Sequence, residues 1–199
     1  MIKKIILFGA LLGAALFASA QETDIQENAR ATRLDSEFVN EYITPARVML
    51  SDGGVVGTEN LLRPYCGQVS TNEPNVCVFR NGKDGRSSVL LDFGKEIHGG
   101  IQIVRAMSAD KAAARFRICF GESVSEALSN VGDAGTTATN EHSVRDFEIF
   151  VPWLGSAEYG NTGFRFMRLE LLGEDTEALL VAVRAVSRYR DIPYVGQFK

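Results

Sequence analysis

Residues 145–166, which read RDFEIFVPWLGSAEYGNTGFRF, combine a strand, a turn and a second strand. Phe147, Ile149 and Val151 occupy every second position, which is the spacing of side chains that share one face of a β-strand. Trp153 continues the same apolar row, and this favours its burial in a core. The stretch therefore predicts a strand-turn-strand unit with one strongly apolar face.

The same two-residue alternation recurs through much of the chain. The alternating apolar positions are Val89, Leu91 and Phe93; Ile101 and Ile103; Phe116, Ile118 and Phe120; and Leu179, Val181, Val183 and Ala185. Arg184 and Arg188 lie on the opposite face of the last of these segments. Roughly six strands of this kind predict an all-β, antiparallel β-sandwich.

Turn signals rich in glycine separate these strands. They stand at residues 52–54, 81–82, 84–85, 98–100 and 173–175. This spacing fits hairpin and Greek-key connections between neighbouring strands. Between residues 164 and 172 the alternation changes face, which predicts a β-bulge or a strand that is buried on both faces.

Residues 1–20 have the layout of a cleavable secretory signal. Two lysines precede an apolar run over residues 5–17, and an Ala-Ser-Ala sequence supplies small residues at the expected cleavage site. The mature chain would then begin at Gln21, so we expect an exported protein, periplasmic or extracellular. No second segment of the sequence is long and apolar enough to span a bilayer.

The 179 residues that follow the signal suffice for one domain with a substantial core. We divide the chain into a signal peptide (1–20), a polar leader (21–45) and a β-sandwich domain (46–199). Loss of the two signal lysines changes the net charge from −4 to −6, and no cluster of basic residues stands out. Nucleic acids and anionic membranes are therefore poor candidates for partners.

Two segments outside the strands have helical spacing. Leu34, Phe38 and Tyr42 recur every four residues, which predicts a short amphipathic helix or an ordered leader. Residues 122–130 predict a helical turn or two. The small, polar residues 131–140 that follow predict a surface loop, where ligand contacts often lie.

The chain has three cysteines, Cys66, Cys77 and Cys119. Export makes a disulfide chemically possible, and Cys66 with Cys77 is the only local pair. Three buried thiols would fit the odd count equally well, so both interpretations stay open. Cys119 belongs to an apolar strand pattern and is expected to lie in the core.

Glycoside hydrolysis needs two carboxylates placed across the sugar. The acids considered for this role are Asp92, Glu96, Glu122, Asp146 and Glu148. Asp146 and Glu148 share one strand face roughly 7 Å apart, which superficially suits an inverting enzyme. Outward-facing, solvated acids have the same spacing, and we favour that interpretation. His98 and His142 belong to no ligand cluster, so we expect neither a metal site nor a cofactor.

Residues 94–100, GKEIHGG, are rich in glycine but lack the spacing of a phosphate-binding loop. We interpret them as a tight turn between two strands. The alternative is a close approach of the backbone to a sugar or to a neighbouring domain.

Four residues of the 145–166 stretch are candidates for sugar binding. An exposed Tyr159 or Trp153 ring could stack on the apolar face of a pyranose, while Asn161 or Arg145 binds its hydroxyls. Tyr159 lacks the apolar neighbour pattern of Trp153, so its environment stays open.

Five segments in this order resemble the N-terminal β-sandwich region of secreted bacterial α-L-rhamnosidases of glycoside hydrolase family 78. The segments are residues 90–100 (LLDFGKEIHGG), 120–123 (FGES), 152–155 (PWLG), 160–166 (GNTGFRF) and 189–194 (YRDIPY). The resemblance covers most of the chain after about residue 46. It implies a jelly-roll-like, galactose-binding-like β-sandwich.

The resemblance also implies what the domain does. In the family such a domain is non-catalytic and precedes an (α/α)6 barrel that carries the acid and base carboxylates. This chain ends at Lys199, about where that barrel would begin, so we expect that it does not hydrolyse rhamnosides alone. The expected role is an accessory domain of a rhamnosidase-like enzyme, with the barrel and rhamnose-containing glycans as partners. The alternative is a stand-alone carbohydrate-binding module, and a small enzyme using Asp146 and Glu148 is disfavoured.

Overall fold

The computed structural model describes residues 38–65, 74–83, 85–107, 111–130 and 145–190. These residues form nine strands and two short helices: β1 (Phe38–Ile43), β2 (Arg47–Asp52), β3 (Gly54–Val56), the 3-10 helix η1 (Thr58–Leu62), β4 (Cys77–Arg80), β5 (Ser88–Arg105), β6 (Ala114–Gly121), α2 (Val124–Leu128), β7 (Asp146–Val151), β8 (Gly155–Leu172) and β9 (Glu177–Arg190). Neither described helix is long and apolar enough to cross a membrane.

The chain divides into two units. Residues 40–189 hold the sheet and both described helices. Residues 1–39 and 190–199 form the other unit, in which the Arg190 guanidinium lies 5.4 Å from the ring centroid of Phe38.

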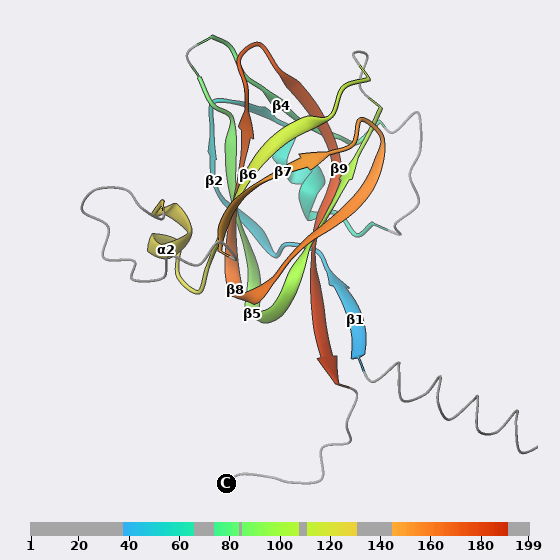
Figure 1. The fold of residues 1–199 in the computed structure, drawn as a ribbon, viewed down its shortest axis with the longest axis vertical. Coiled ribbons are helices and arrows are strands. Elements are labelled where there is room, and N and C mark those ends of the chain that lie inside the picture. Colours follow the sequence, from blue (N-terminus) through green and yellow to red (C-terminus); the bar gives the residue numbers. More distant parts are fainter. Residues whose placement is uncertain (1–37, 66–73, 84, 108–110, 131–144, 191–199) are drawn as a thin grey trace, which may run out of the picture. The chain divides into compact units, whose positions relative to one another are not determined.

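Two long strands, β5 and β8, organise the sheet, and Figure 1 shows them curving side by side. The sheet has the order β3-β4-β9-β5-β8-β6-β7, with β1 beside β9 and β2 beside β5. Residues 88–92 of β5 pair with β2 and with residues 166–170 of β8. Residues 99–105 pair with β9 in place of β2, and residues 101–105 stay paired with residues 155–159 of β8. The two ends of β5 therefore belong to different halves of one antiparallel sheet.

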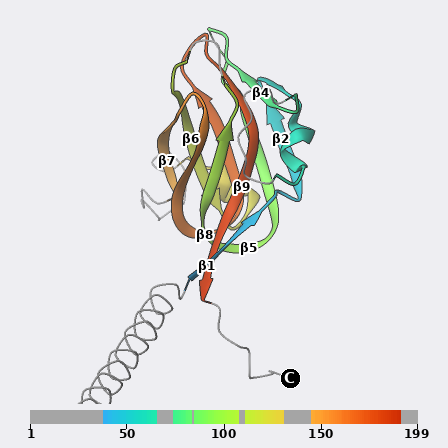
Figure 2. The ribbon, with the colours of Figure 1, turned by 90° about the vertical axis from the view of Figure 1, so that its right-hand side faces the viewer.

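These two halves fold over each other. β4 and β6 are four strand spacings apart in the sheet, which would be roughly 19 Å if it were flat. Nevertheless the ring centroids of Phe79 in β4 and Phe116 in β6 lie 5.7 Å apart, edge to face. Figure 2 looks onto β9, with β6 and β7 on one side and β4 and β2 on the other. The predicted antiparallel β-sandwich is confirmed.

The core between the halves contains most of the predicted apolar rows. Its buried members include Val89, Leu91, Phe93, Ile101, Ile103, Phe116, Ile118, Phe120, Ile149 and Val151. In β9 the prediction is partly wrong, because Leu180, rather than Leu179 or Val181, enters this core beside Val183. The pairing of β5 with β9 shifts register between Val104 and Arg105, which lie opposite Ala182 and Leu180. This shift changes which residues of β9 face the core before Val183.

The glycines at residues 98–100 do not form the predicted turn. They lie inside β5 at a bulge, where the pairing with β8 shifts between Gly99 and Ile101. Gly99 has φ 151°, and a Cβ there would lie 1.9 Å from the carbonyl oxygen of Val186. A Cβ on Gly100 would lie 2.3 Å from the carbonyl oxygen of Tyr159. The glycines thus permit close backbone contact with β9 and β8, because no other residue lacks a Cβ.

The slip predicted between residues 164 and 172 has a clear origin. Phe164 and Met167, three positions apart, both enter the main core. Phe166 between them is buried on the opposite face, against Leu90 and Ala127 of α2. The predicted helical turn at residues 122–130 is therefore present as α2, and it covers this part of β8. Ser123 caps it by accepting a hydrogen bond from the Glu126 N–H at 3.2 Å.

A helix at Phe38 and Tyr42 is wrong, because residues 38–43 form strand β1 beside β9. A spacing of four residues fits one face of a helix, but it also fits one face of a strand. Residues 21–37 of the polar leader lie outside the described residues, as do the predicted signal peptide, residues 131–140 and Cys66.

Cys77 and Cys119 are buried free thiols. Burial, with a smaller contribution from Glu59, raises the pKa of Cys77 to about 12. Cys119 lies on the outer face of β6, where the Arg168 guanidinium donates to its Sγ at 3.1 Å.

Candidate functional site

The structure places the four predicted sugar-binding residues around the hairpin of β7 and β8. Tyr159 is half-buried against the core, and its hydroxyl donates to the Phe150 carbonyl oxygen at 2.7 Å. Trp153 is partly buried beyond the end of β7 and is outside the main core cluster. Asn161 is exposed in β8. The phenol ring of Tyr159 therefore packs inward and its hydroxyl secures the outermost strand.

Arg145 lies apart from Trp153. They flank opposite ends of β7, whose six residues span roughly 17 Å. The Arg145 guanidinium is buried and donates from Nη1 to the carbonyl oxygen of Glu126 at 3.3 Å. The Glu126 carboxylate lies at the same distance. Arg145 therefore holds α2 against the start of β7, and the four candidates do not converge on one point.

Asp92, Asp146 and Glu148, three of the acids considered for catalysis, are engaged by arginines. Arg117 donates to both carboxylate oxygens of Asp146, at 2.7 and 2.6 Å. Glu148 lies 3.5 Å from Arg115 in a more exposed pair. Both carboxylates thus fit structural ion pairs across β6 and β7. Glu148 is exposed to solvent, as the favoured interpretation expects, whereas the Asp146 side chain is buried in its ion pair with Arg117.

Asp92 is fully buried at the bend of β5. Its carboxylate accepts hydrogen bonds from Arg165 at 2.9 Å, from Arg47 at 2.7 Å and from the Gly94 N–H at 2.7 Å. These donors, Arg165 first, hold the pKa of Asp92 well below its usual range. Such a carboxylate stays charged and ties β2, β5 and β8 together.

The most developed polar site lies on the outer face of the β1, β5, β8 and β9 half of the sheet. We call it the outer-face cluster, and it comprises Tyr42, Tyr65, Gln102, Glu158, Arg184 and Arg188. Gln102 stands directly opposite Glu158 of β8 and Arg184 of β9. Ile101 and Ile103 on either side of Gln102 enter the core, so alternation directs the Glu158-Gln102-Arg184 row outward.

Gln102 links the two charged groups of this row. Its side-chain oxygen accepts a hydrogen bond from Arg184 Nε at 3.2 Å, and its amide nitrogen donates to Glu158 Oε1 at 3.4 Å. Arg184 Nη1 also donates to the Tyr65 carbonyl oxygen at 2.8 Å. The guanidinium lies 4.5 Å from the ring centroid of Tyr42 and 5.6 Å from that of Tyr65. Arg184 is therefore a fixed, largely buried cation beside two aromatic rings.

Tyr42 forms the exposed side of the cluster. Its hydroxyl donates to Glu158 Oε1 at 2.6 Å, and 42% of the residue is accessible to solvent. The hydrogen bond to Glu158, burial and the Glu158 charge raise the pKa of Tyr42, whereas Arg184 and Arg188 oppose this shift. Arg188 itself lies 3.7 Å from Glu158. The tyrosine hydroxyl is thus close to one carboxylate and two guanidinium groups.

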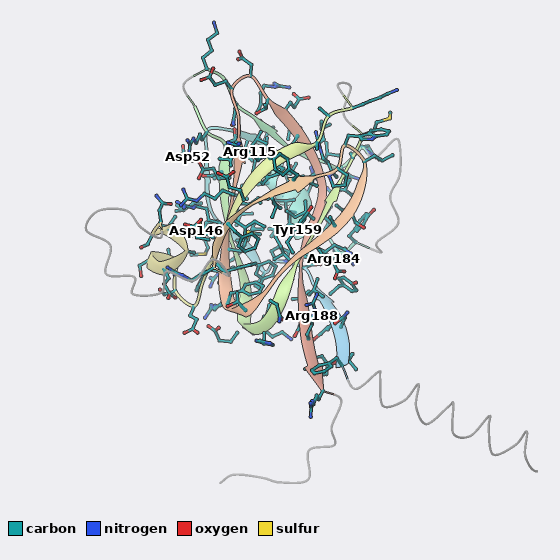
Figure 3. The ribbon with its side chains drawn as sticks, viewed as in Figure 1. Asp52, Arg115, Asp146, Tyr159, Arg184 and Arg188 are labelled. Atoms are coloured by element: carbon teal, nitrogen blue, oxygen red, sulfur yellow. The ribbon has the colours of Figure 1, made fainter. Side chains whose placement is uncertain are left out.

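The cluster offers an aromatic ring beside planar hydrogen-bonding groups. Figure 3 shows Arg184 and Arg188 following each other along β9. Aromatic rings contact the apolar faces of sugars, while carboxylate, amide and guanidinium groups bind hydroxyls.

The alternation in sequence predicted that both arginines lie opposite the core-facing side of β9. Tyr42 was missed as a partner because it comes from a strand 60 residues before Gln102.

No protein-family model matches the sequence, and a comparison with curated proteins finds no match. Solved structures with a similar fold include a rhamnosidase from Klebsiella oxytoca with rhamnose bound (15% identity, TM-score 0.49, 76% of this chain) and a family 78 rhamnosidase of Bacillus sp. GL1 (18%, 0.46, 70% of this chain). A fucose-binding module of Streptococcus pneumoniae is also similar (15%, 0.45, 74% of this chain).

The chain spans 29% and 13% of the lengths of the two rhamnosidases and covers 96% of the fucose-binding module. Rhamnosidases are thus among the structures similar to this chain, as the sequence resemblance predicts. At these identities the similarity concerns the fold.

Proposed function

We propose that this chain is a carbohydrate-binding β-sandwich, the non-catalytic accessory domain of an α-L-rhamnosidase-like glycoside hydrolase. The observation that supports sugar binding is the outer-face cluster, where the exposed ring of Tyr42 adjoins Glu158, Arg184 and Arg188. A pyranose can stack on such a ring while its hydroxyls meet the charged groups.

Hydrogen bonds within the protein already hold the side chains of the cluster in place. Arg184 has hydrogen bonds through Nε, Nη1 and Nη2, and Tyr42 is anchored through its hydroxyl. Side chains that are already ordered lose little conformational entropy when a ligand binds. This favours recognition of a ligand over a merely solvated sheet face.

The assignment to a rhamnosidase-like enzyme rests on the five resembling sequence segments. An (α/α)6 barrel would supply the acid and base carboxylates, and this domain would help to bring the glycan to it. We infer that the chain alone does not hydrolyse rhamnosides. An exported, stand-alone carbohydrate-binding module is the second candidate, because the outer-face cluster lies within one chain and needs no other domain.

Calorimetry of the purified chain with rhamnose-containing oligosaccharides tests sugar binding. We expect measurable affinity that Tyr42→Ala reduces at least about tenfold, since stacking and a hydrogen-bonding hydroxyl are lost together. Phe150→Ala is the matched control, because Phe150 is 65% exposed on β7 and lies outside the cluster. Equal losses in both variants, or affinity that survives Tyr42→Ala, would contradict the assignment of the site.

The enzyme question has its own test. Turnover of an aryl rhamnoside by the purified chain, abolished by Asp146→Asn, would overturn the non-catalytic assignment. Thermal melting of that variant must accompany the assay, because Asp146 also pairs with Arg117.

A further inference from the structure

The charges of the outer-face cluster indicate which kind of sugar it selects. We propose that it binds an acidic saccharide, with the carboxylate of a uronic acid received by Arg188 beside the Tyr42 ring. This inference rests on the proposed sugar-binding function and names the ligand class of the same site.

The first argument is charge balance. The cluster contains two guanidinium groups, Arg184 and Arg188, and one carboxylate, Glu158. That carboxylate already accepts from the Tyr42 hydroxyl and the Gln102 amide. One positive charge is left in excess, on a chain whose net charge is −4. An anionic group on the ligand would complete the balance.

The second argument is the environment of Arg184. The residue is 8% exposed, and among the described residues no carboxylate lies within ion-pair distance of it. Its partners are two neutral oxygens, from Gln102 and Tyr65, and two tyrosine rings. Burying a charge without an opposite charge is unfavourable, and a nearby anion offsets part of that cost.

The third argument is the availability of Arg188. Its Nη2 is 3.7 Å from Glu158, which is an ion-pair distance longer than a hydrogen bond, and the side chain is 35% exposed. A guanidinium held this loosely can form the two parallel hydrogen bonds that a carboxylate accepts from arginine. Arg184 would contribute its charge from beneath the Tyr42 ring, without moving.

The test compares an oligogalacturonate with the same oligosaccharide after reduction of its carboxyl groups to alcohols. We expect calorimetry to give at least roughly tenfold tighter binding of the acidic form, as one charge-assisted bidentate contact allows. Added salt should weaken the binding of the acidic oligosaccharide more than the binding of the neutral one. Arg188→Gln should abolish the preference, and Arg188→Lys should restore only part of it. Arg115→Gln on β6, an exposed arginine outside the cluster, should leave it unchanged.

The outcomes separate the two proposals. Equal binding of both forms, weakened in each by Tyr42→Ala, would overturn acid selection but leave the sugar-binding function standing. Binding of neither saccharide, nor of rhamnose-containing ones, would overturn both. A preference that survives Arg188→Gln in a variant with unchanged thermal stability would remove Arg188 as the receptor of the carboxylate.

Discussion

At the scale of single residues, Asp92 shows how a polar side chain can hold a β-sandwich together. Its carboxylate has no solvent exposure and joins Arg47 of β2 to Arg165 of β8. The sequence identified Asp92 only as one acid among several. Its role follows from the strand register that places Arg47 opposite it.

We expect Asp92→Asn to lower the free energy of unfolding by about 2 kcal/mol, because two arginines would lose a buried carboxylate partner. Both arginines are partly exposed, which keeps the loss below that of a fully buried pair. Urea denaturation measures the change. Glu177→Gln breaks the exposed Arg80 pair and should cost less than about 1 kcal/mol. Similar costs for the two variants would contradict the structural role of Asp92.

The same carboxylate predicts a loss of stability in acid. Its pKa in the folded state lies below the ordinary value of about 3.9, so folding is stabilised while Asp92 is charged in both states. The contribution is complete above that value and is lost as the pH falls through the lower, folded-state pKa. Urea midpoints measured from pH 6 to pH 2 should therefore fall less steeply for Asp92→Asn. Parallel curves for the two proteins would refute this.

At the scale of elements, local sequence predicted the strands well and the connections less well. The alternating rows define β5, β6 and β7, and residues 122–130 contain α2. Residues 94–100 look like a turn because they contain three glycines, yet β5 continues through them. A glycine can form a turn or can allow a neighbouring backbone to approach closely. The strands that lie beside it decide between the two, and the spacing of residues along the sequence does not reveal those strands.

Gly99→Ala tests the bulge in β5. The added Cβ would lie 1.9 Å from the Val186 carbonyl oxygen, and the φ of 151° is unfavourable for alanine. We expect a loss of about 3 kcal/mol or more in the free energy of unfolding. Gly82→Ala meets no atom within 4 Å and should change stability by less than about 1 kcal/mol. A mild effect of Gly99→Ala in urea denaturation would count against the close approach.

At the scale of the whole molecule, the folding of one sheet onto itself creates both the core and the outer-face cluster. The core forms where β4 meets β6, and the cluster forms where β1 lies against β9. Tyr42 reaches Glu158 over a separation of 116 residues. Such contacts depend on how the halves of the sheet meet.

The contact of Phe79 with Phe116 tests this arrangement. Phe79→Ala should lower the free energy of unfolding by about 3–5 kcal/mol, because a fully buried ring leaves a cavity. A double-mutant cycle with Phe116→Leu and Phe79→Leu should give a coupling of about 0.5–1.5 kcal/mol. A coupling near zero would indicate that the rings do not meet across the two halves.

Apolar alternation along the sequence was enough to predict an all-β sandwich with core-facing rows, because alternation depends only on the geometry of each strand. It also predicted that Arg184 and Arg188 face away from the core. Three outcomes were not predictable from the sequence: Tyr159 packs inward, Arg145 lies apart from Trp153, and Tyr42 joins Glu158. Those outcomes depend on strand register and on the bulges in β5, and both are set by contacts between residues far apart in sequence.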